Sequence, residues 1–110
     1  MKFTVEHVGG CALISGTGRL NMVQAPRLRE VVAEEVGAGH HHVVIDMAGV
    51  EFVDSTGLGA LVGCLKLARQ AGGDLRIAAV NDQVRMLLKL TGMDRVLTPY
   101  GSPRDACPEA

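Results

Sequence analysis

Hydrophobic and polar positions follow two spacings along the chain. Short apolar runs such as Val43–Met47 predict strands, whereas apolar positions three and four residues apart, such as Leu58, Leu61 and Leu65, predict a helix. The predicted strands span residues 3–8, 11–15, 43–47 and 75–80, with a short last strand at 95–97. The predicted helices span about 24–37, 55–71 and 82–91.

The order of these elements predicts an α/β fold. Gly9 and Gly10 join the first two strands as a hairpin, and the helices between the later strands imply right-handed crossovers. We therefore expect a mostly parallel sheet of four to five strands, with one antiparallel pair at its edge and helices packed on it. Loops at the carboxyl ends of parallel strands gather at one edge. This edge, here called the rim, is predicted to hold residues 18–23, 54–56 and 81–82.

Length and composition fit one domain with a real core. The chain has 110 residues, of which 47% are hydrophobic, and it shows no internal repeat or low-complexity tract. Three prolines and several small residues follow position 98. We expect residues 1–98 to form the domain and residues 99–110 to form a loosely ordered tail.

Charge, hydropathy and cysteines bear on partners and location. A net charge of -1 gives no electrostatic basis for binding nucleic acid or an anionic membrane. No apolar run is long enough to span a bilayer, and residues 1–4 do not start a secretory signal. Cys11, Cys64 and Cys107 are odd in number and far apart, so we expect reduced thiols in a cytoplasmic protein.

Polar residues crowd the predicted start of the second long helix. Asp54, Ser55 and Thr56 come there directly before Gly57 and Gly59. Oxygens at this position can cap backbone N–H groups that have no carbonyl partner. One hydroxyl could serve only as a cap, but two behind a carboxylate also suit an anion or a docking protein.

The stretch Asp54-Ser55-Thr56-Gly57-Leu58-Gly59 resembles the signature of the STAS-domain anti-sigma factor antagonists. These bacterial proteins release a sigma factor by binding an anti-sigma kinase. The resemblance covers roughly residues 3–98 and includes three further segments: residues 18–21, 70–73 and 90–93. It implies a STAS fold without a catalytic site or a cofactor of its own.

The resemblance also implies specific roles. Ser55 matches the serine that the kinase phosphorylates with its own ATP, with Thr56 as the rival acceptor, and a separate phosphatase would reverse the modification. The family usually has an aspartate where this chain has Asn21, which affects the expected rate of phosphorylation and the choice of partner. Together with the rim prediction, the expected partner-binding residues are Arg19, Asn21, Met22, Asp54, Ser55, Thr56, Gly57, Leu58 and Asn81.

Two other functions remain open at this stage. A STAS scaffold in a sensory or lipid-transport assembly would need no phosphorylation of Ser55. A small enzyme using Ser55 or Asp54 would need a general base, and no histidine or Gly-x-Ser-x-Gly elbow accompanies Ser55.

Two apparent ligand motifs carry less weight. The glycines at 57, 59 and 63 are spaced one residue too long for a dinucleotide loop, and the chain has no phosphate-binding Gly-x-x-x-x-Gly-Lys sequence. His40, His41 and His42 are consecutive and cannot easily converge on one ion, so we expect a solvated loop and no metal.

Overall fold

Five strands form the main sheet, in the order β1-β2-β4-β6-β7. β1 and β2 are antiparallel, and the remaining neighbours are parallel, which confirms the predicted topology. The structure is a computed structural model that describes residues 2–107. The strands are β1 Phe3–Val8, β2 Cys11–Gly16, β4 His42–Asp46, β6 Asp74–Ala78 and β7 Pro99–Tyr100.

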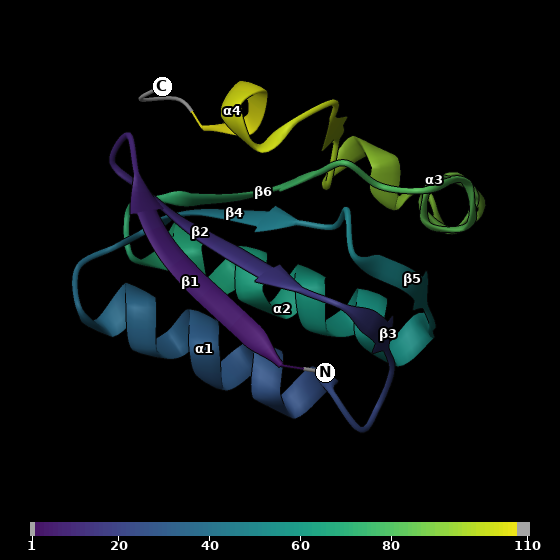
Figure 1. Cartoon of the computed structure of the whole chain (residues 1–110), viewed down its shortest axis with the longest axis horizontal. Coiled ribbons are helices and arrows are strands. Elements are labelled where there is room, and N and C mark those ends of the chain that lie inside the picture. Colours follow the sequence, from purple (N-terminus) through teal and green to yellow (C-terminus); the bar gives the residue numbers. More distant parts are fainter. Residues whose placement is uncertain (1, 108–110) are drawn as a thin grey trace.

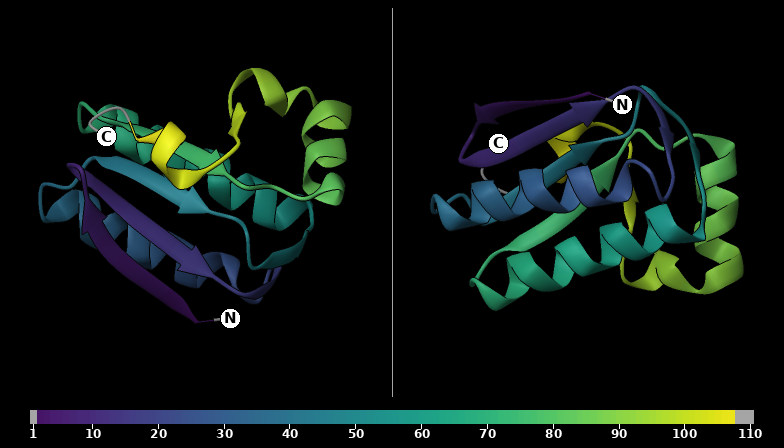
Figure 2. Two further views of the ribbon diagram at one scale, coloured as in Figure 1. Left: turned by 45° about the horizontal axis from the view of Figure 1, so that its top comes forward. Right: turned by 90° about the horizontal axis from the view of Figure 1, so that it is seen from below.

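Two long helices cover one face of this sheet (Figure 1). α1, Ala25–Gly37, and α2, Ser55–Gln70, pack side by side, as the view from below in Figure 2 shows. Their apolar stripes meet the inward-facing side chains of β2, β4 and β6 in one core. α3, Asp82–Thr91, lies at the rim, and the short α4, Pro103–Ala106, lies on the opposite face of the sheet. No helix in residues 2–107 is long and apolar enough to cross a membrane.

A second sheet of two short strands was not predicted. β3, Gly18–Leu20, pairs in parallel with β5, Val50–Val53, where we expected only loops. The two middle residues of β5 are exposed and only its ends are buried, so the strand lacks the period-two alternation that marks longer strands. This small sheet supports the rim.

The strand predicted at residues 95–97 was wrong. Met93–Arg95 is a turn of 3-10 helix, η1, which follows Gly92 in a left-handed conformation with a φ of 72°. Leu97 is 1% exposed and fills the core, which explains the apolar pattern that suggested a strand. The last strand instead begins at Pro99 and pairs with β6.

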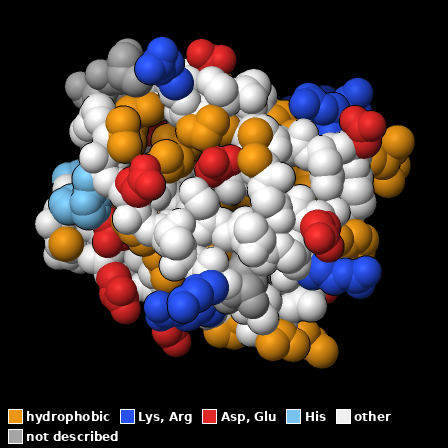
Figure 3. Space-filling view, viewed as in Figure 1, with side chains coloured by type: hydrophobic (Ala, Val, Ile, Leu, Met, Phe, Trp, Pro, Cys, Tyr) orange, Lys and Arg blue, Asp and Glu red, His pale blue; other side chains and the backbone are white. Residues whose placement is uncertain are grey.

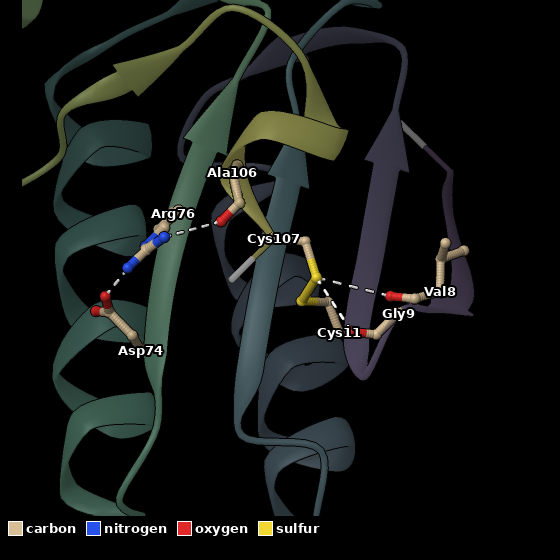
Figure 4. Close-up of a disulfide and its surroundings, with 7 residues drawn as sticks. All are labelled: Val8, Gly9, Cys11, Asp74, Arg76, Ala106 and Cys107. Carbon is tan, nitrogen blue, oxygen red and sulfur yellow. Dashed lines mark hydrogen bonds and ion pairs between the residues drawn. A yellow bond between two sulfur atoms is a disulfide. The ribbon is translucent and has the colours of Figure 1, made fainter. Parts of the chain in front are cut away.

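The segment from residue 99 to 107 is not the loose tail that we expected. Its backbone continues the sheet as β7 and then forms α4, which packs against β6 and β4. Arg76 donates to the carbonyl of Ala106 at 3.2 Å (Figure 4). Its guanidinium also lies over the ring of Tyr100. Prolines at 99 and 103 begin these two elements, positions that need no backbone N–H donor. Residues 108–110 lie outside the described part of the chain.

The expectation of three reduced cysteines was also wrong. Cys11 at the start of β2 and Cys107 after α4 form a disulfide across the outer face of the sheet (Figure 4). Ninety-six positions separate them in sequence, so spacing could not reveal the pair. Cys64 in α2 is a free buried thiol. Burial raises its pKa to about 11, an effect that the charge of Arg29 partly opposes.

Candidate functional site

The start of α2 exposes the predicted phosphoacceptor. Asp54 is the N-cap residue, and its Oδ1 accepts the backbone N–H of Gly57 at 2.7 Å. Ser55 is therefore the first residue inside the helix and not its cap, and both Ser55 and Thr56 are exposed. With the capping role taken by Asp54, Ser55 is an exposed residue at the positive end of the helix dipole.

A tight backbone contact positions this helix start. The N–H of Asp54 donates to the carbonyl of Leu20 at 3.3 Å, and a Cβ added to Gly57 would lie 2.2 Å from that same oxygen. Gly57 is buried, and Leu58 is 6% exposed within the core. Gly57 and Leu58, which were also predicted to contact the partner, lie beneath the site and present little surface.

The loop after β3 presents apolar side chains to solvent. Oδ1 of Asn21 accepts the backbone N–H groups of Val23 at 3.0 Å and Gln24 at 3.3 Å, an arrangement that closes the turn before α1. Met22 and Val23 are each 71% exposed as a result. Asn21 thus has a local structural role that an aspartate could also fill, because both side chains offer the accepting oxygen.

The small sheet adds a cation and an aromatic ring to the same region. Arg19 of β3 pairs in register with Phe52 of β5, and its guanidinium carbon lies 5.6 Å from the centre of the exposed ring. A cation–π contact of this kind at an exposed site contributes about 0.5–1 kcal/mol. Figure 3 shows further hydrophobic side chains on the surface at the end of the molecule where β3 and α3 lie.

Two amide side chains at the start of α3 form hydrogen bonds with the backbone of β5. Asn81 caps α3 by accepting the N–H of Val84, and it donates to the carbonyls of Val50 and Glu51 at 3.2 and 2.9 Å. Gln83 accepts the N–H of Val53 at 3.0 Å and donates to its carbonyl at 2.9 Å. Sequence reasoning found Asn81 but missed Gln83, because an amide in a first helical turn looks like an ordinary solvated residue.

The rim therefore brings together most of the predicted residues. Hydrogen bonds join β3 to β5, β3 to the start of α2, and β5 to the start of α3, and the 21–24 loop follows directly after β3. The scan of family models matches the STAS domain over residues 2–106. The chain belongs to the STAS-domain family.

Relatives of this STAS domain include two named antagonists. An anti-sigma F factor antagonist of Paenibacillus polymyxa is 27% identical over 110 residues, which cover 99% of this chain and 94% of the relative. An anti-sigma-B factor antagonist of Staphylococcus epidermidis is 37% identical over 76 residues, which cover 69% and 70%. The predicted resemblance is confirmed, and the match extends past residue 98 to include α4.

Solved structures confirm the STAS fold. An anti-sigma factor antagonist from Mycobacterium paratuberculosis superposes with a TM-score of 0.84 at 30% identity, covering 96% of this chain and 89% of that one.

Proposed function

We propose that this STAS domain is an anti-sigma factor antagonist that binds an anti-sigma kinase through the rim and is switched off by phosphorylation of Ser55. The observation that carries the proposal is the position of Ser55: it is exposed, it is the first residue of α2, and Asp54 relieves it of the capping role. Relatives that are named anti-sigma factor antagonists support the general role.

Electrostatics supports a switch that leaves the fold intact. A phosphate on Ser55 would carry about −1.5 to −2 charges at a helix N-terminus, where a negative charge is stabilised by about 0.3–1 kcal/mol. The modification would thus not unfold α2. It would instead place bulk and charge among the exposed apolar residues of the rim, inside the surface that a partner covers.

A binding role fits the site better than catalysis. The Asp54 carboxylate, the nearest candidate base, is already held as the cap by the N–H of Gly57. An activated serine needs a base free to take its proton. We therefore assign the phosphoryl-transfer chemistry and the ATP to the kinase and removal of the phosphate to a separate phosphatase. We place the site of action in the cytoplasm because kinase and sigma factor work there; the Cys11–Cys107 disulfide does not support this location.

The first test is direct phosphorylation. The purified chain is incubated with candidate anti-sigma kinases and ATP, and the modified residue is mapped by mass spectrometry. We expect one phosphate on Ser55, none on the Ser55→Ala variant, and unchanged modification of Thr56→Ala. Modification of Thr56 in the unaltered chain would assign the switch to the rival residue.

The second test separates a switch from a scaffold. We expect Ser55→Asp to weaken kinase binding at least tenfold, or about 1.4 kcal/mol, while Ser55→Ala binds as the unaltered chain does. Gln70→Glu, which adds one negative charge at the opposite end of α2, serves as the matched control and should bind normally. Equal binding by all variants, with no modification of Ser55, would support the STAS scaffold instead.

A further inference from the structure

A cluster of metal-ligating side chains lies at the opposite end of the molecule from Ser55. His7 of β1, Glu35 of α1 and His40 in the loop before β4 each offer one ligand atom, and these three atoms lie within 4.8 Å of one another. Figure 3 shows histidine side chains gathered at this end of the surface, beside acidic ones. Of the three consecutive histidines, only His40 belongs to the cluster. The other two ligand atoms come from β1 and α1, which the sequence pattern did not bring together with His40.

Local folding rules bring Glu35 and His40 together. α1 ends at Gly37, and Gly39, two residues later, has a left-handed conformation with a φ of 95°. The N–H of Gly39 donates to the carbonyl of Val36 at 3.0 Å, and the N–H of His40 donates to that of Glu35 at 2.8 Å. This is the paired hydrogen bonding of a Schellman motif, which folds the chain back over the last helical turn.

The alternation of side chains along β1 places the third residue, His7, beside Glu35. Phe3 and Val5 of β1 pack against the core that α1 covers, and His7 continues the same face because strand side chains alternate. Nε2 of His7 lies 2.5 Å from Oε1 of Glu35. The ring centres of His7 and His40 are 4.2 Å apart.

One ring nitrogen in this cluster lacks a hydrogen-bond partner. Nδ1 of His40 is buried and lies 3.6 Å from Oε1 of Glu35, too far for a hydrogen bond. A buried polar atom without a partner is costly unless something else satisfies it. A cation between the three ligand atoms would satisfy this nitrogen and neutralise the carboxylate.

We propose that His7, Glu35 and His40 bind a zinc-class divalent cation, with water in the fourth position. Two imidazole nitrogens and one carboxylate oxygen suit Zn²⁺, whereas Mg²⁺ prefers oxygen ligands alone. Tetrahedral bonds of about 2.0–2.1 Å place ligand atoms about 3.3–3.4 Å apart. The side chain of His7 is 55% exposed, so it can rotate to reach that geometry. The ion would join the β1–β2 hairpin to α1.

Zinc titration of the full chain, purified without a histidine tag and stripped of metal, tests the site. We expect one Zn²⁺ per chain by calorimetry, with binding unaffected by excess Mg²⁺. Glu35→Gln, His40→Gln and His7→Gln should each weaken binding at least tenfold. Absorption of bound Co²⁺ in the visible range should show four-coordinate geometry and should be lost in the same variants.

The neighbouring residues provide matched controls. His41→Gln and Glu34→Gln remove the same side-chain types one position away and should change the affinity by no more than about twofold. Absence of Zn²⁺ binding in the unaltered chain would overturn the proposal. So would equal weakening by the controls, or competition by Mg²⁺. Circular dichroism of each variant verifies that it is folded, and the surface position of His7 provides a variant that leaves the core untouched.

Discussion

Gly57 and Gly59 are two residues apart in α2, but their surroundings differ. A Cβ at position 57 would lie 2.2 Å from the carbonyl oxygen of Leu20, whereas a Cβ at position 59 would have no neighbour within 4 Å. Only Gly57 is therefore required by the packing of α2 against β3. The sequence motif contains both glycines and cannot distinguish them, because the difference arises from a residue 37 positions earlier in the chain.

Alanine substitution should separate these two glycines. Gly57→Ala forces backbone atoms apart and should lower the free energy of unfolding by at least about 2 kcal/mol. Gly59→Ala removes glycine's backbone entropy from an exposed helical site and should raise it by about 0.5–1 kcal/mol. Urea denaturation of both variants measures the difference. Similar stabilities would show that α2 does not approach Leu20 this closely.

Among the elements, the long ones were predictable and the short ones were not. α1, α2, α3, β1 and β6 have enough residues to show their period, and α2 begins at Ser55 as expected. β3, β5 and β7 have three, four and two residues, too few for a period to appear. β3 and β5 pair with each other, and β7 pairs with β6, so each of these strands depends on a partner that is distant in sequence. The position of the rim could thus be predicted from the sequence. The pairing of β3 with β5 and the hydrogen bonds of Gln83, which hold the rim residues in place, could not.

The attachment of α3 to β5 is testable at Gln83. Gln83→Ala leaves the N–H and C=O of Val53 without their partners and should destabilise the fold by about 1–3 kcal/mol. Arg85→Ala, an exposed position on the same helix, should change stability by less than about 0.5 kcal/mol. Thermal unfolding compares the two. Amide hydrogen exchange should also become faster at Val53 in the Gln83 variant only.

For the whole molecule, the main feature that the sequence does not reveal is the disulfide between the start of β2 and the residue after α4. The disulfide fixes α4 over the outer face, where Cys11, Val44, Ala78, Ala106 and Cys107 form a small second core. Sequence periodicity reports on neighbours along the chain and carries no information about a pair 96 positions apart. For the same reason it missed the meeting of His7 with Glu35.

Removing the disulfide should weaken the whole fold. Cys107→Ser is expected to lower the free energy of unfolding by about 2–4 kcal/mol, because the unfolded chain loses a constraint that spans most of its length. A reductant should destabilise the unaltered chain by a similar amount and leave the variant unchanged, which is the internal control. If a reductant leaves the unaltered chain equally stable, the bond does not form.

Thiol counting gives an independent measure. The buried thiol of Cys64, with its raised pKa, should resist alkylation in the native state at neutral pH. Denaturation without reductant should then reveal one reactive thiol, and denaturation with reductant all three cysteines. Three reactive thiols without reductant would contradict the structure.

The Cys11–Cys107 disulfide also determines how the protein responds to a pulling force. Tension applied outside the Cys11–Cys107 pair passes through the disulfide and leaves the chain between the two cysteines, residues 12–106, unloaded. A single oxidised molecule stretched in an optical trap should therefore hardly lengthen. A reductant should release on the order of 300 Å of extended polypeptide in one step.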